Sequence, residues 1–146
     1  IDMEWKQFRL NQIKNVVDHA YEIAHKHGKK LTAAVFPYPE MADHMVRQRW
    51  DKWNIDEVYP MIYHNFYNEG MNWIGFATQQ GVTDLKGKQT QLNTGIYVPG
   101  VETEDELRKT ILLAKENGAA GVTFFDGPAI SDAYLKVIAA TKASLK

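Results

Sequence analysis

Aromatic side chains recur in this sequence at four points where a short apolar run ends, often together with polar groups. These positions are Phe36, Tyr38 and Glu40; Tyr63, His64, Asn65, Phe66 and Tyr67; Tyr97 and Pro99; and Phe125 and Asp126. Aromatic rings stack on the apolar faces of sugars, while hydroxyl, amide and carboxylate groups orient the sugar hydroxyls. The pattern predicts a carbohydrate-binding surface, and the alternative is that individual rings only close the top of the core.

Five of these residues are the predicted substrate contacts. We expect Tyr38 and Tyr97 to stack on sugar rings and Asp126 to contact a sugar hydroxyl. Tyr63 and His64 would orient the ligand, and imidazole, with a reference pKa of about 6.5, also suits a general acid or base.

Carboxylates are scarce at these positions. Hydrolysis of a glycosidic bond usually requires two carboxyl groups about 5 to 9.5 Å apart. Only Glu40 and Asp126 follow apolar runs, and they lie after the first and the last of them. Asp126 could instead cap its own turn, and Glu40 could start a helix. Glu40 and Asp126 are therefore a weak candidate for a catalytic pair.

Phosphate and metal chemistry receive less support. The sequence has no nucleophile-elbow, Walker or dinucleotide-binding glycine motif. The glycines in VPGVE (98–102) and DGPAIS (126–131) leave a phosphosugar site as an alternative. The histidines show no ligand spacing with carboxylates, so we expect neither a metal nor a cofactor.

Composition sets the broad class. The 146 residues are 45% hydrophobic and 24% charged, which is typical of one globular domain. A formal charge of -1 does not favour nucleic acid or an anionic membrane as a partner, so a carbohydrate is the better match. No apolar run approaches the roughly 20 residues of a membrane span. Without cysteines, the sequence leaves the compartment open, including the periplasm or the outside of a bacterial cell.

Hydrophobic periodicity predicts the elements that position these residues. Helices are expected over about 3–27, 39–52, 103–118 and 131–145, with another near Trp73 and a loop over 81–91. Strands are expected over 31–36, 56–67, 92–98 and 121–125. The first strand, LTAAVF, is apolar enough to be buried on both faces. Pro60 lacks an N–H for the ladder, and we predict a bulge there rather than an edge strand.

Alternating strands and helices predict an α/β fold with a parallel sheet. Two architectures fit: an open doubly wound sheet, and half of a TIM barrel. A long leading helix without its strand favours the (βα)4 half-barrel. The chain also begins without methionine, so we expect 1–146 to be one domain of a larger protein.

The segment VRQRWDKWNIDEVYPMIYHNFY (46–67) resembles the carboxyl-terminal half of bacterial glycoside-hydrolase-like TIM barrels, the family-ten-like hydrolases and their chitinase-superfamily relatives. In these proteins a tryptophan-bearing helix leads to an aspartate and a PM-x-Y strand. The matching residues, in order, are Trp50, Trp53, Asp56, Pro60, Met61 and Tyr63. GKKLTAAVFPYP looks like barrel strand five, and GVTFFD like strand eight.

By this resemblance, Tyr63 projects into the sugar-binding cleft. Chitinases typically place aspartate after this tyrosine, whereas this chain has His64, and their acidic D-x-x-D-x-D-x-E motif has no match here. The resemblance therefore implies that the catalytic residues lie outside this chain. The resemblance implies part of a polysaccharide-acting glycoside hydrolase, with one wall of its cleft in this segment and little activity in the segment alone. Partners would be a carbohydrate and either a second copy or the other half-barrel. A non-catalytic carbohydrate-binding or assembly module is the main alternative.

Overall fold

The computed structural model of the protein describes residues 2–145. The helices are α1 (Met3–Lys26), α2 (Pro39–Val46), α3 (Trp73–Asp84), α4 (Glu104–Glu116) and α5 (Asp132–Ser144). The strands are β1 (Thr32–Val35), β2 (Glu57–Pro60), β3 (Gln91–Tyr97) and β4 (Gly121–Phe125). Short 3-10 turns are η1 (Trp50–Lys52), η2 (His64–Tyr67), η3 (Val98–Gly100) and η4 (Gly127–Ala129).

The four strands form one parallel sheet in the order β1-β2-β3-β4. A doubly wound sheet reverses its strand order at a switch point, whereas each strand here lies beside its predecessor. Sequential order is the arrangement of a barrel wall. The predicted α/β fold of four parallel strands alternating with helices is therefore confirmed, and its topology is that of a (βα)4 unit.

The sheet has one covered face and one open face. The helices pack on the face formed by alternate strand residues, among them Val35, Val58, Leu92 and Ile96. The other face carries residues that are register partners on neighbouring strands. From the amino to the carboxyl end of the sheet, these partners are Thr32, Glu57 and Gln91; Ala34 with Tyr59, and Asn93 with Gly121; Met61, Gly95 and Thr123; and Tyr97 with Phe125. Because Thr32 and Ala34 are exposed, the prediction that the first strand is buried on both faces is wrong.

Helix capping follows the sequence signals. Thr103 Oγ1 accepts a hydrogen bond from Glu106 N at 3.2 Å, and Glu106 Oε2 accepts one from Glu102 N at 2.7 Å, which satisfies two free N–H donors at the start of α4. Ser131 caps α5 by accepting from Tyr134 N at 3.2 Å. These caps confirm the predicted starts of both helices.

The predicted helix 39–52 is wrong in its second half. α2 ends at Val46 because Arg47 adopts the left-handed conformation, with φ of 61°, and its guanidinium donates to the carbonyls of Asp43 and His44. Trp50 then lies in the separate turn η1, fully buried, and its indole N–H donates to Phe36 O at 3.0 Å. The tryptophans are core residues, as their pattern indicates, but they do not share a helix with Val46.

The predicted strand 56–67 is also shorter than expected. β2 ends at Pro60, where Ile62 N donates to Pro60 O at 2.9 Å in a tight turn. Glu57 pairs with Gln91 and Met61 bridges to Gly95 at the same offset, so no residue is inserted and the predicted bulge is wrong. Met61 N donates to Val35 O on β1, so the main-chain polar groups of the preceding residue, Pro60, face β3. Because proline has no N–H, the β2–β3 ladder lacks one hydrogen-bond donor at this position.

The region 81–91 is partly helical rather than a loop. α3 extends to Asp84, and Gly81 lies in it at a point of close packing. A side chain at Gly81 would meet Leu92 Cδ1 at 2.7 Å and the Trp50 ring at 3.0 Å. Glycine here reflects close approach of α3 to the sheet and to η1, and not a break in the helix.

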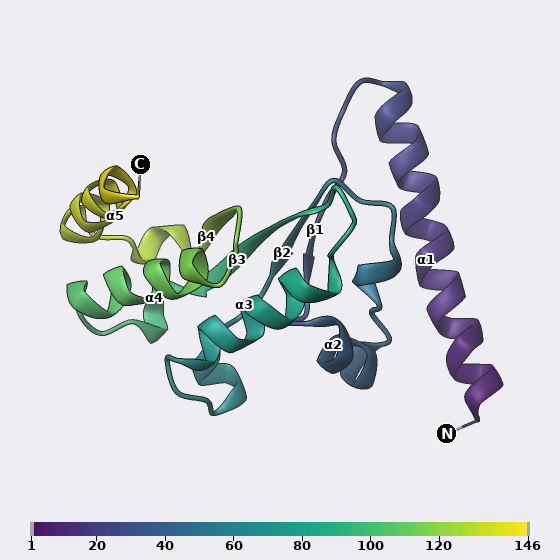
Figure 1. Ribbon diagram of the computed structural model, residues 1–146, viewed down its shortest axis with the longest axis horizontal. Helices are drawn as coiled ribbons and strands as arrows, with labels where there is room; N and C mark the ends of the chain where they lie inside the picture. The colour runs from purple at the N-terminus through teal and green to yellow at the C-terminus, as the bar shows by residue number, and fades with distance from the viewer. Residues whose placement is uncertain (1, 146) are drawn as a thin grey trace.

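Figure 1 shows the resulting arrangement. α1 stands at one end of the molecule and α5 at the other, with the sheet and the remaining helices between them. The two termini accordingly lie at opposite ends. α1 packs Ile13 and Val17 against the core, and Asp18 Oδ1 accepts from Asn54 N at 3.0 Å.

Candidate functional site

Four aromatic side chains meet at the carboxyl end of the sheet. We call them the rim cluster: Tyr63, Phe66, Tyr97 and Phe125. The Tyr63 ring lies 5.6 Å from the ring of Tyr97 and 5.8 Å from that of Phe125, measured between centroids. Phe66 meets Tyr97 edge to face at 4.9 Å. These separations are those of interacting aromatic pairs, so the cluster is a connected surface.

The strands and their turns place these rings. Tyr97 and Phe125 are register partners at the ends of β3 and β4, on the open face. Tyr63 follows the tight turn after β2, and Phe66 N donates to Tyr63 O at 2.8 Å as η2 begins. Phe125 and Phe66 remain 53% and 64% exposed, so the cluster is accessible from solvent.

Below the rim cluster, the open face forms a cavity of about 250 Å³. Small side chains of Ala34, Gly95 and Thr123 line it, together with Tyr59 and Met61. A TIM-barrel interior is usually filled with bulky branched residues. The small residues at Ala34, Gly95 and Thr123 leave the sheet surface concave here.

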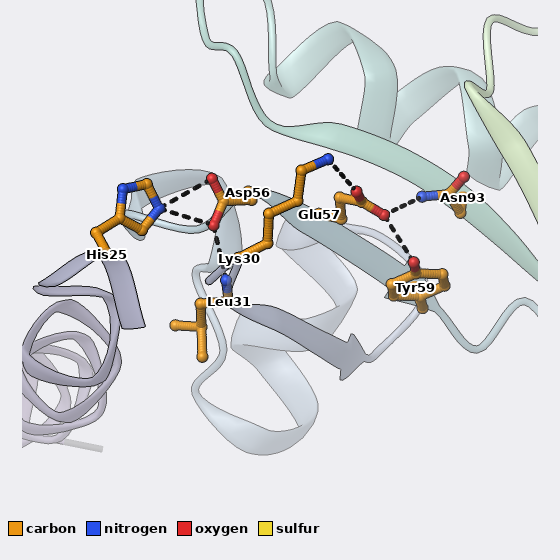
Figure 2. Close-up of polar contacts among 7 residues, drawn as sticks. All are labelled: His25, Lys30, Leu31, Asp56, Glu57, Tyr59 and Asn93. Atoms are coloured by element: carbon orange, nitrogen blue, oxygen red, sulfur yellow. Dashed lines mark hydrogen bonds and ion pairs between the residues drawn. The ribbon is translucent and has the colours of Figure 1, made fainter. Parts of the chain in front are cut away.

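A polar network lies on the same face, toward the amino ends of the strands, and Figure 2 shows its contacts. Glu57 accepts hydrogen bonds from Lys30 Nζ at 2.9 Å and from the Tyr59 hydroxyl at 2.7 Å, and more weakly from Asn93 Nδ2 at 3.4 Å. The hydrogen bonds from Lys30 and Tyr59 lower the pKa of Glu57. The hydrogen bond to Glu57 and partial burial raise the pKa of Tyr59. Glu57 is therefore ionised at neutral pH, with its acceptors occupied.

Asp56 joins α1 to the sheet, as Figure 2 also shows. Its Oδ2 accepts from Leu31 N at 2.7 Å and lies 3.0 Å from His25 Nε2. Desolvation opposes ionisation of Asp56, but the hydrogen bonds from His25 and Leu31 N–H lower its pKa overall. Asp56, which is one of the residues that match the glycoside-hydrolase-like pattern, thus holds α1 against the amino ends of β1 and β2.

His64 and Asp126 lie on the turns after β2 and β4. Burial lowers the pKa of His64, and the charge of Glu106 opposes this only in part, so the imidazole is neutral at pH 7. Asp126 follows Phe125 directly across a cis peptide bond. Its Oδ1 is buried without a hydrogen-bond partner among the described residues.

Tyr38 lies apart from the rim cluster. Its ring contacts Phe76 at 5.8 Å and Trp73 at 6.4 Å, both edge to face, and Tyr67 meets Trp73 at 5.2 Å. We call Tyr38, Tyr67, Trp73 and Phe76 the α3 cluster. The structure therefore brings Tyr63 and Tyr97 together but places Tyr38 in a second aromatic group.

Some site residues escaped the sequence prediction. Phe66 and Phe125 follow apolar runs, yet the predicted contacts did not include them. The sequence does contain a pattern that points to the network residues Glu57, Tyr59 and Asn93. Polar residues alternate with apolar ones along β2 and β3. Alternation of this kind indicates a strand with one uncovered face.

The glycine turns offer little to a phosphate. A side chain at Gly100 would meet the Asn65 amide at 2.9 Å, so this turn is packed. The first turns of α4 and α5 contain only acidic charges: Glu104, Asp105, Glu106 and Asp132. Their carboxylates oppose an anion at either helix start.

Within residues 2–145, no group of three or more histidine, aspartate or glutamate side chains has the geometry of a metal site. No helix in the same range is long and apolar enough to cross a membrane.

Comparisons with protein-family models, with curated proteins and with solved structures find no match.

Proposed function

We propose that this chain is part of a glycoside-hydrolase-like protein that acts on a polysaccharide, and that it supplies one wall of the sugar-binding cleft. The observation that carries the proposal is the rim cluster: four connected rings at the carboxyl end of a parallel sheet, above a concave open face. Ligands of parallel α/β folds bind at this end.

The polar groups around the rings suit a sugar. Neutral His64 can donate or accept a hydrogen bond, and Asp126, a partly buried carboxylate next to Phe125, can accept one. Burial raises the pKa of the Tyr63 phenol, so its hydroxyl stays protonated. Rings for stacking and a few polar groups for orientation are what a carbohydrate site requires.

The catalytic acids are proposed to belong to another part of the protein. Of the two carboxylates predicted beside apolar runs, Asp126 adjoins the rim cluster, while Glu40 starts α2 near Tyr38. A glycosidase needs a working pair across one bond. The chain by itself would therefore bind a glycan without cleaving it.

This same scarcity of carboxylates supports the second candidate, a non-catalytic carbohydrate-binding module. The two candidates share the binding surface and differ in chemistry. Glycan cleavage by a longer protein that contains this chain would support the hydrolase, and binding without cleavage would support the module.

Binding is tested by titrating the protein with soluble N-acetylglucosamine and cello-oligosaccharides while recording amide NMR spectra. We expect shifts at Tyr97, Phe125 and Asp126. Tyr97→Ala should weaken binding, whereas Phe8→Ala, which removes a 50% exposed ring on α1, should leave it unchanged. If no oligosaccharide shifts the rim cluster, the proposed function is wrong.

A further inference from the structure

The α3 cluster has features of a binding surface in its own right. Phe76 is 48% exposed, and Tyr38, Tyr67 and Trp73 are partly exposed. Tyr38 and Trp73 pack against a small core of Ile62, Ile74 and Ala77, so these two rings also have a packing role. The outer side remains free for a ligand.

A shallow, open cavity of about 500 Å³ lies against this cluster. Trp73 and Phe76 line it together with Glu69, Asn72 and Lys109. The volume is within the range of small-molecule sites, which is about 300 to 1,000 Å³. The lining pairs aromatic faces with a carboxylate, an amide and an ammonium group, which supply both donors and acceptors.

The charges in this cavity favour an uncharged ligand. Glu69 and Lys109 carry one negative and one positive charge, and neither has an ion-pair partner among the described residues. A sugar hydroxyl can donate to Glu69 and accept from Lys109 or Asn72. An anionic or cationic group would meet one favourable and one unfavourable charge.

The turn η2 connects this cavity to the rim cluster. Tyr63 and Phe66 belong to the rim cluster, and Tyr67 belongs to the α3 cluster. Four residues of 3-10 helix advance the chain by only about 8 Å. The Tyr63 phenol is also close enough to contribute to the raised pKa of Tyr67. The two aromatic groups are therefore neighbours across one short turn.

We propose that the cavity lined by Trp73, Phe76, Glu69, Asn72 and Lys109 is a second sugar subsite, so that the ligand is an uncharged glycan chain spanning both aromatic clusters. This inference rests on the proposed function, because it extends the same binding surface. It assigns to the protein a preference for long chains over single sugars or disaccharides.

Chain-length dependence tests the subsite. Calorimetric titration would compare the disaccharide and the hexasaccharide of the oligosaccharide series that shifts the rim cluster. We expect the hexasaccharide to bind at least tenfold more tightly, and only the hexasaccharide to shift the amides of Gly70 and Asn72. The variants Phe76→Ala and Lys109→Ala should bring hexasaccharide affinity toward that of the disaccharide, with disaccharide binding unchanged.

Phe8→Ala is the matched control, and thermal unfolding checks that each variant folds. Equal affinity for both lengths, or variants that weaken both ligands alike, would overturn the second subsite while the rim site stands. Failure of both ligands to bind would overturn the proposed function and the subsite together. Shifts at Gly70 and Asn72 that the rim variant Tyr97→Ala leaves intact would support the subsite independently.

Discussion

The rings of Tyr63 and Phe125 stack with an interplanar angle of 14° and a centroid separation of 5.8 Å, although β3 lies between β2, which Tyr63 follows, and β4, which ends at Phe125. Two strand spacings amount to about 9.6 Å. The tight turn after β2 and the end of β4 therefore bring the two side chains together above β3. In this way separate strand ends form one surface.

Tyr63 offers a way to separate ring stacking from hydrogen bonding. We expect Tyr63→Phe to keep the aromatic packing and the free energy of unfolding nearly unchanged, because the hydroxyl has no hydrogen-bond partner among the described residues. Glycan affinity should fall about fivefold if the hydroxyl contacts the sugar, since a neutral hydrogen bond contributes about 1 kcal/mol. Calorimetry on both proteins measures this, and unchanged affinity would remove the orienting role of Tyr63.

Gly95 is required by the close approach of β2 and β3. A β-carbon at this position would lie 2.6 Å from the Pro60 carbonyl oxygen and 3.4 Å from Met61 Cα, both backbone atoms. We expect Gly95→Ala to lower the free energy of unfolding by about 1 to 3 kcal/mol.

Urea denaturation checks this prediction. Gly70→Ala is the control, because nothing lies within 4 Å of an added β-carbon there. If the two variants are equally stable, β2 and β3 can move apart to make room for the added methyl group at little cost in free energy.

The fold was largely predictable from sequence because its signals are local. Capping at Thr103 and Ser131 and the 3.6-residue periodicity fix the helices, and the alternation of elements fixes a parallel sheet. The errors lie where tertiary contacts override periodicity. Val46, Trp50 and Trp53 share a helical spacing, but the left-handed Arg47 and the indole hydrogen bond of Trp50 divide them between two elements.

The candidate site was less predictable, since proximity depends on sheet order. Strand ends identify aromatic candidates, but only the register of β3 with β4 brings Tyr97 beside Phe125. Tyr38 follows β1 in the same way, yet its ring turns to Trp73 and Phe76 on α3. Nothing in the sequence indicates that the Tyr97 ring lies on the open face while the Tyr38 ring packs against α3.

Asp51 should make stability depend on acidic pH. Its carboxylate is buried, and despite desolvation the hydrogen bonds from Arg49 and Lys52 lower its pKa. A lowered folded pKa means that the stabilisation is complete above the unfolded value of about 3.9 and is lost as pH falls through the folded pKa.

Thermal unfolding from pH 6 to 2 measures this dependence. Asp51→Asn should cost about 2 kcal/mol near neutral pH and flatten the acid limb of the profile. Asp105→Asn, at a 91% exposed side chain, is the control. If the Asp51→Asn protein loses stability with falling pH as steeply as the native chain, groups other than Asp51 cause the pH dependence.

The network on the open face predicts a spectroscopic change. The hydrogen bond to Glu57, burial and the Glu57 charge all raise the pKa of Tyr59. Glu57→Gln removes the charge, so Tyr59 should lose its proton at a lower pH than in the native chain. NMR titration of the ring carbons measures this, with Glu116→Gln on the exposed side of α4 as control. An unchanged titration would mean that Glu57 and Tyr59 are not bonded in solution.

The open face should also drive self-association. β1 and β4 each have one unpaired edge within the described sheet, and Ala34 and Phe125 leave apolar surface exposed between them. Unpaired edges and apolar faces favour pairing with another chain. Two copies of four parallel strands supply the eight strands of a closed barrel. We therefore expect a homodimer at micromolar concentration, or pairing with the other half-barrel in a longer protein.

Sedimentation velocity tests this expectation. Ala34→Lys places a charge on the open face and should weaken the dimer at least tenfold, because a desolvated ammonium would have to be buried. Ala139→Lys, at an exposed position of α5, should leave it unchanged. A native chain that stays monomeric at micromolar concentration would contradict the homodimer. Weakening by Ala139→Lys and not by Ala34→Lys would place the interface at α5, away from the open face.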